Sequence, residues 1–213
     1  MNISVRAESL GFSYQRGQMI VDDVNLSVAE GSITGITGPS GRGKSTLLYL
    51  FGLLLTPTAG DIWVADTPVR TISDAERSRL RAEKYGFVFQ DAALDPARSV
   101  LENVLEPILY KAKRSRESVS RAHELLERFG VEARAAARPG QISGGQAQRI
   151  ALCRAIVGRP SILIADEPTG NLDAAAASVV LDAFREQANA GVSVIIATHD
   201  QLVTASCDRI VQL

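Results

Sequence analysis

The sequence has few of the residues that build metal clusters and disulfide frameworks. Its 213 residues include two cysteines, Cys153 and Cys207, which lie far apart in the chain. Two cysteines without a CxxC pair cannot form a zinc site alone, so we expect both to be small, reduced core residues. Two histidines, His123 and His199, are too few for a His-rich metal cluster.

Long apolar runs and a charge excess of either sign are also missing. The longest apolar run, residues 47–55, contains Gly52 and is shorter than the roughly 18–20 residues that a membrane-spanning helix needs. The N-terminal stretch MNISVRAESL has no basic region followed by an apolar one, so we expect no secretory signal. A formal charge of −1 gives no reason to expect nucleic acid as a partner. We therefore expect a soluble, cytoplasmic chain.

Strands and helices are expected to alternate along the chain. Up to about residue 36, apolar residues in every second position predict strands with one buried face. Four later runs are mostly apolar or β-branched, which is typical of parallel strands covered on both faces. These runs are residues 32–37, 85–90, 161–166 and 192–199. Helical patterns lie between them, so the sequence predicts an α/β fold.

One stretch of the chain differs from this alternation. Residues 91–154 lack a good buried strand and have a mostly helical pattern. We expect a single domain over residues 1–213, in which residues 1–90 and 155–213 form the core and residues 91–154 form an inserted helical subdomain.

The strongest motif follows the first apolar run. Residues 38–45 match the pattern G-x-x-x-x-G-K-[ST] in full. Glycines let consecutive backbone N–H groups converge on a phosphate, and a helix that begins near Gly43 adds its positive end. Lys44 supplies a mobile positive charge, and Ser45 can place its hydroxyl on Mg²⁺. A glycine-rich turn with a chance lysine is the weaker interpretation, because a strand precedes the motif and an apolar helix follows it.

The third apolar run ends in two acids, Asp166 and Glu167. An acid that closes a buried strand beside a phosphate loop can hold Mg²⁺, directly or through water. A second carboxylate next to it can orient or deprotonate the attacking water. The alternative is a solvated turn, which Pro168 would suit.

Four further residues are weak signals when taken singly. Gln90 and His199 close two of the other apolar runs, which is a common place for a polar residue. Asp173 precedes an Ala-rich helix and suits an N-cap. Tyr14 is either a turn aromatic or a residue that stacks on a base.

A second phosphate-binding element is expected at residues 143–146. The sequence Ser-Gly-Gly-Gln precedes an apolar helical pattern, so it offers an N-cap hydroxyl, free N–H groups and a helix dipole. One chain thus carries two such elements, and their spacing does not say whether they face each other.

These motifs resemble those of the nucleotide-binding subunit of ATP-binding cassette (ABC) transporters, in the same order and over nearly the whole chain. The resemblance implies a P-loop NTPase core with a mainly parallel sheet, an N-terminal antiparallel β subdomain and an inserted α-helical subdomain. It implies adenine stacking by Tyr14, a Q-loop at Gln90 and a D-loop at Asp173. It implies a Walker A loop whose nucleotide-binding residues are Gly38, Ser40, Gly41, Gly43, Lys44, Ser45 and Thr46. It implies that the family signature lies at Ser143, Gly144, Gly145 and Gln146. It implies ATP and Mg²⁺ as ligands, with Glu167, His199 and Lys44 catalytic and with Ser45, Gln90 and Asp166 at the metal.

The resemblance also implies partners. Two cassettes, here identical copies, would meet head to tail, so that each ATP lies between one Walker A loop and the other chain's signature. Closure on ATP and reopening after hydrolysis would drive a transmembrane permease, which would hold the chain at the inner face of the membrane. Residues 167–173, 87–90 and 101–104 look like the macrolide-exporter and lipoprotein-release branch, whereas residues 92–96 are less typical of it.

Two other functions remain open from the sequence alone. A soluble ABC-type ATPase of chromosomes or ribosomes would usually carry coiled coils or two cassettes, and this sequence has neither. A P-loop kinase would leave residues 143–146 without a role.

Overall fold

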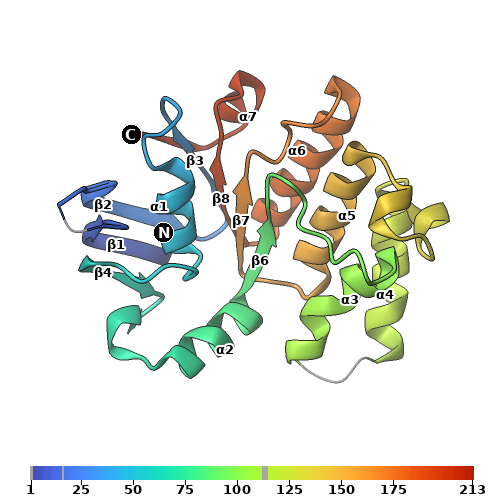
Figure 1. The fold of residues 1–213 in the computed structure, drawn as a ribbon, viewed down its shortest axis with the longest axis horizontal. Helices are drawn as coiled ribbons and strands as arrows, with labels where there is room; N and C mark the ends of the chain where they lie inside the picture. The colour runs from blue at the N-terminus through green and yellow to red at the C-terminus, as the bar shows by residue number, and fades with distance from the viewer. Residues whose placement is uncertain (1, 16, 112–114) are drawn as a thin grey trace.

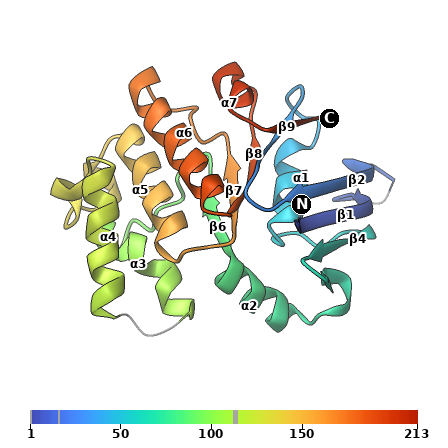
Figure 2. The same ribbon diagram turned by 180° about the vertical axis from the view of Figure 1, so that it is seen from behind.

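The computed structural model describes residues 2–15, 17–111 and 115–213. Two sheets and seven α-helices make up most of this described part (Figures 1 and 2). The strands are β1 (Ile3–Phe12), β2 (Val21–Ala29), β3 (Ile33–Thr37), β4 (Ala59–Val64), β5 (Thr67–Pro68), β6 (Tyr85–Val88), β7 (Ile162–Asp166), β8 (Ser193–Ala197) and β9 (Arg209–Gln212). The helices are α1 (Lys44–Phe51), α2 (Asp74–Lys84), α3 (Val100–Lys111), α4 (Arg116–Arg128), α5 (Gly144–Val157), α6 (Ala174–Asn189) and α7 (Gln201–Ala205).

The parallel sheet has the strand order β6-β7-β8-β3-β9. Its first four strands are the four apolar runs, so the predicted parallel strands are confirmed. β7 and β8 are buried along their whole length, because helices or the second sheet cover both faces. The fifth strand, β9, lies at the edge of the sheet, and most of its residues are exposed. The sequence did not predict it.

The antiparallel sheet has the order β2-β1-β4-β5. Buried residues recur along β1 and β2, and Figure 1 shows this sheet beside α1, away from α3, α4 and α5. The expected N-terminal antiparallel β subdomain is therefore confirmed, although β4 and β5 extend it beyond residue 36.

The two faces of the parallel sheet belong to two hydrophobic cores. On β7, Leu163 and Ala165 pack in a core with α3, α4, α5 and α6. Ile162 and Ile164 point the other way, into a core with α1 and the antiparallel sheet. Successive side chains of a strand alternate between its faces, so this single strand joins both cores. Cys153 is fully buried in the first core, and both cysteines are free.

Residues 91–154 are built mainly of α3, α4 and α5, as expected. The division into a core and a helical subdomain stays a prediction, and α5 runs across its expected boundary at residue 154. Within the described ranges, no helix has both the length and the apolar character needed to cross a bilayer.

Candidate functional site

Four predicted site segments follow neighbouring strands at one edge of the parallel sheet. Residues 38–45 follow β3, Gln90 follows β6, Asp166 ends β7, and His199 follows β8. Parallel strands present their carboxyl ends at the same edge, which is where open α/β sheets bind ligands. Direct hydrogen bonds join the segments that follow β3, β7 and β8.

The loop at residues 38–45 curls back on itself before α1. Gly43 has φ 86°, and a Cβ built on it would lie 2.8 Å from the carbonyl oxygen of Ile20, so glycine is required there. The Lys44 Nζ donates to the carbonyl oxygens of Gly38 at 2.9 Å and Pro39 at 3.2 Å. The ammonium group therefore lies over the loop whose N–H groups would receive a phosphate.

Asp166 is 3% exposed and contacts α1. The Ser45 hydroxyl donates to its Oδ1 at 3.1 Å, and the Tyr49 hydroxyl donates to its Oδ2 at 3.0 Å. Burial raises the pKa of Asp166 above its ordinary value, and the hydrogen bonds from these two hydroxyls offset only part of that increase. The predicted pairing of the loop with the acid at the end of β7 is therefore present.

Glu167 lies between the ends of β7 and β8. Its Oε1 is 2.7 Å from His199 Nδ1, and its Oε2 accepts from the Thr198 hydroxyl at 3.1 Å. Its backbone has φ 45°, in the left-handed region that non-glycine residues rarely adopt, and its N–H bonds to the carbonyl oxygen of Ala197. The Glu167 side chain is 13% exposed and that of His199 is 77% exposed, so the pair opens to solvent on the histidine side.

The Ser-Gly-Gly-Gln element begins α5 with a capping box. Ser143 Oγ accepts from the Gln146 N–H at 3.3 Å, and Gln146 Oε1 accepts from the Ser143 N–H at 2.9 Å. Gly144 is exposed, and a Cβ built on it meets nothing within 4 Å. Nothing inside the chain thus requires glycine at this position, which leaves its bare backbone open to approach from outside. Among the described residues, no hydrogen bond joins this element to residues 38–45.

Side chains from α5 and from the segment before α6 hold the backbone around Gln90. Gln148 donates to the carbonyl oxygen of Phe89 at 3.2 Å, and Asn171 donates to that of Gln90 at 3.4 Å. Arg154, which is 7% exposed, donates to the carbonyl oxygens of residues 92 and 93 at 2.7 and 2.6 Å. Helix α5 therefore begins at the signature element and also fixes the loop that contains Gln90.

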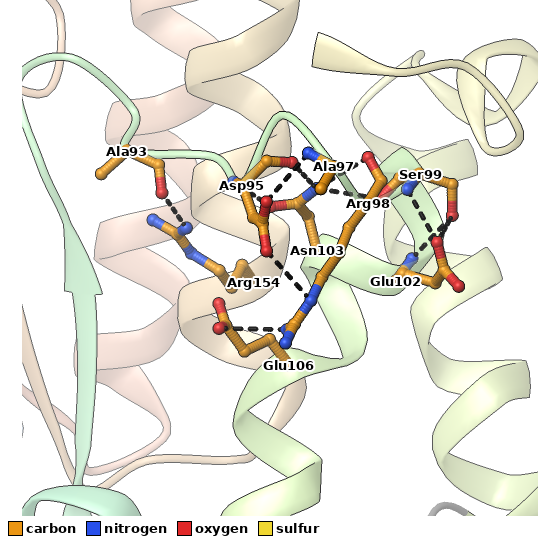
Figure 3. A network of polar contacts seen from close by, with 9 residues as sticks. All are labelled: Ala93, Asp95, Ala97, Arg98, Ser99, Glu102, Asn103, Glu106 and Arg154. Atoms are coloured by element: carbon orange, nitrogen blue, oxygen red, sulfur yellow. Dashed lines mark hydrogen bonds and ion pairs between the residues drawn. The ribbon is translucent and has the colours of Figure 1, made fainter.

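A second polar network holds the chain that follows residue 93 (Figure 3). Asn103 is fully buried and bonds to the N–H and the carbonyl oxygen of Asp95 and to the carbonyl oxygen of Ser99. Arg98 bridges the carboxylates of Asp95 and Glu106, both at 3.1 Å. Polar groups of residues 95, 98 and 99 in this irregular segment thus have defined partners.

A groove of about 520 Å³ lies between α2, β6 and α3. Phe87 and Phe89 line it with stacked rings whose centroids are 5.7 Å apart. Leu54, 43% exposed, and Pro107 extend the apolar wall, and Glu106 adds a carboxylate. The groove combines an apolar floor with charge beside it, and it lies next to the loop of Gln90.

Two other predicted site residues, Tyr14 and Asp173, contact residues close to them in the chain or on α1. Tyr14 is 63% exposed, its ring meets Phe12 edge-on at 4.8 Å, and its hydroxyl is 3.4 Å from Thr46 Oγ1. Asp173 caps α6 by accepting from the Ala176 N–H at 2.8 Å, as the sequence predicted. Stacking on adenine and a D-loop role for these residues stay predictions, as do the roles given to Ser40, Gly41 and Gly145.

Sequence reasoning did not identify several residues that position the site. Tyr49, Thr198, Gln148 and Arg154 all contact a predicted site residue or the backbone beside one. For Tyr49 there was a usable signal, because it lies four residues after Ser45 and so on the same face of α1. The others become visible only when strands and helices distant in sequence are brought together.

The donor set fits Mg²⁺ bound together with a nucleotide. The described residues contain no group of three or more His, Cys, Asp or Glu side chains that could hold a metal alone. Mg²⁺ usually takes one or two carboxylates and completes its shell with waters and substrate phosphates. Asp166 and the Ser45 hydroxyl, in contact beside a phosphate-type loop, match that requirement.

Comparisons with known proteins agree with this geometry. The sequence profile of the ABC transporter family matches residues 21–170. The chain is 41% identical to "Lipoprotein-releasing system ATP-binding protein LolD" of Xanthomonas oryzae pv. oryzae, over 98% of this chain and 87% of the relative. It is 39% identical to the LolD protein of Paramagnetospirillum magneticum, over 100% of this chain and 96% of the relative.

The fold is also similar to that of a solved structure. The dimeric ATP-binding cassette MJ0796, in a post-hydrolysis state with bound ADP and Pi, superposes with a TM-score of 0.93 at 35% identity, over 98% of this chain and 94% of that one. The profile match, the similar sequences and this similar fold together place the chain in the ABC transporter family, as one of its ATP-binding cassettes.

Proposed function

We propose that the chain converts ATP and water to ADP and phosphate, and that it does so as the energising subunit of an exporter. One arrangement carries the proposal: Ser45 touches Asp166, and Glu167 next to it is oriented by Thr198 and His199. A phosphate loop, a metal carboxylate and a second, oriented carboxylate are the parts that phosphoryl transfer to water requires.

Each side chain then has a defined task. Lys44 and the N–H groups of residues 38–45 bind the phosphates, and Tyr14 offers a ring face to the base. Ser45, Asp166 and Gln90 would hold Mg²⁺, which would supply positive charge to neutralise the phosphate oxygens. Glu167 accepts the proton of the attacking water, and His199 contacts the terminal phosphate.

The second cassette supplies the rest of each site. The open backbone at Gly144, next to Ser143, is suited to reach the phosphates held by another copy. The similar cassette MJ0796 is a dimer with ADP and Pi bound, which supports the same assembly here. With one cassette in this chain, two identical copies are the simplest pair.

The membrane partner is proposed to dock in the groove between α2 and α3. An apolar floor with Phe87 and Phe89 suits the apolar face of a short helix from a permease. Binding there would reach the loop of Gln90 directly. The names of the relatives, which describe a lipoprotein-releasing system, favour export of that class, with the chain held at the inner face of the membrane. No observation favours a chromosome or ribosome ATPase.

Glu167→Gln tests the proposal. Loss of the general base should lower ATP hydrolysis by roughly 10²–10⁴-fold, while ATP still binds. Because closure precedes hydrolysis, this variant should form an ATP-bound dimer that sedimentation detects with ATP and Mg²⁺. Glu127→Gln, an exposed glutamate of α4, is the matched control. Wild-type turnover in Glu167→Gln would contradict the assignment of the base, and a monomer at all ATP concentrations would count against the shared site.

A further inference from the structure

Helix α1 presents two hydroxyl groups to one carboxylate. Ser45 and Tyr49 are four residues apart, so they lie on the same face of the helix. Ser45 donates to Asp166 Oδ1 and Tyr49 donates to Oδ2, at 3.1 and 3.0 Å. Each oxygen of the carboxylate therefore has its own donor.

Tyr49 is placed to be a permanent donor in this pair. A tyrosine phenol ordinarily titrates only at about pH 10, so the Tyr49 hydroxyl keeps its proton near neutral pH and acts as a donor to the carboxylate. Since Asp166 is 3% exposed, little water is available to replace a lost hydroxyl.

The ring of Tyr49 is held as well as its hydroxyl. Phe89 meets it edge-on, with ring centroids 6.4 Å apart, and Phe89 is itself stacked on Phe87. Tyr49 and Phe89 line the same hollow of about 550 Å³ beside Gln90. Phe89, which follows β6, thus contacts the Tyr49 ring on one side.

We propose that Tyr49 is a positioning residue for the metal site, which fixes the rotation of Asp166 so that its Oδ1 side, shared with Ser45, faces the cation. The inference rests on the proposed ATPase function. Tyr49 acts through Asp166 and is not itself a metal ligand. Residues that hold a metal ligand in place typically contribute a factor of roughly 10–100 to metal affinity.

Tyr49→Phe tests the inference, because it removes the hydroxyl and keeps the ring. The probe is Mn²⁺, titrated by electron paramagnetic resonance into the full chain with stoichiometric ADP. We expect the affinity for Mn²⁺ to fall roughly tenfold or more. The affinity for ADP in EDTA should stay at the wild-type value, because Lys44 and the phosphate loop are untouched. General damage to the fold would lower both affinities.

Tyr110→Phe is the control, since Tyr110 is an exposed tyrosine of α3. Wild-type Mn²⁺ affinity in Tyr49→Phe would overturn the inference, and so would an equal loss of ADP affinity in EDTA. If the wild-type chain neither binds ADP nor hydrolyses ATP, the proposed function fails and the role of Tyr49 fails with it. If the wild type does both and Tyr49→Phe matches it, only the role of Tyr49 is lost.

Discussion

At the scale of single residues, the site depends on side chains that hold other side chains. Thr198 is fully buried, and its hydroxyl donates to Glu167 Oε2 while accepting from the Asp200 N–H at 3.0 Å. Asp200 in turn accepts a hydrogen bond from the hydroxyl of Thr169 at 3.1 Å, and Thr169 lies two residues after Glu167 in the sequence. The carboxylate is therefore held in one orientation from the end of β8.

We predict that Thr198→Val lowers kcat for ATP hydrolysis roughly tenfold, equivalent to about 1.4 kcal/mol of transition-state stabilisation. The two side chains have nearly the same shape, so the change removes the hydrogen bond to Glu167 and the one from the Asp200 N–H. KM for ATP should not change, because Thr198 does not contact the phosphate loop. Steady-state kinetics measure both constants. Thr67→Val, at an exposed position of β5, is the control, and a changed KM with constant kcat would contradict the assigned role.

At the scale of elements, side chains of α5 and α3 fix the segment of residues 91–99, which forms neither a strand nor a helix. Ala92 and Ala93 have φ of 60° and 45°, so this backbone is strained as well as non-repetitive. Arg154 satisfies their carbonyl oxygens, and Asn103 satisfies backbone groups of residues 95 and 99. Because Gln90 comes directly before this segment, its stability bears on the site.

We predict that Asn103→Leu lowers the free energy of unfolding by about 3 kcal/mol. Leucine has a similar volume, but it removes the three hydrogen bonds that the buried Asn103 side chain makes to the Asp95 N–H and to the carbonyl oxygens of Asp95 and Ser99. Urea unfolding followed by circular dichroism measures the change. Asn189→Leu, at the exposed end of α6, should stay within about 0.5 kcal/mol of the wild type. An equally small change in Asn103→Leu would mean that the network does not stabilise the fold.

At the scale of the whole molecule, one sheet connects the nucleotide edge to a groove. β6 contributes Phe87 to the groove and continues through Phe89 into the loop of Gln90. An occupant of the groove would thus touch the backbone that leads into the site. Coupling between two sites requires an element that both can bias, and the common element here is β6 with its following loop.

Leu54→Glu should therefore abolish binding of the permease. A carboxylate at the apolar wall would have to lose water when the partner docks, which costs more than the contact returns. The test is co-purification of a permease with the tagged chain from detergent-solubilised membranes of cells that express both. Val179→Glu, which adds the same charge at an exposed position of α6, is the control, and melting temperatures check folding. Equal recovery of a permease with Leu54→Glu would place the docking surface elsewhere.

The amino-acid sequence was enough to predict the buried strands and several of the residues that the structure brings together at one edge of the sheet. Each predicted motif consists of neighbouring residues at a fixed spacing, so it can be recognised in the sequence alone. This holds for residues 38–45, Asp166, Glu167 and residues 143–146. The four buried strands could be found because they are covered on both faces and so are almost continuously apolar. The edge strand β9 lacks that pattern, so nothing in its residues predicted it.

The side chains that hold the chemical groups in place were set by tertiary packing and could not be predicted. The hydroxyl of Tyr49 reaches Asp166 across 117 positions of the chain, and that of Thr198 reaches Glu167 across 31. Such contacts leave no periodic trace in a sequence, since they depend on how strands and helices pack rather than on local preference. The groove at β6 has the same origin, because its walls come from α2, β6 and α3 and exist only after these elements have packed together.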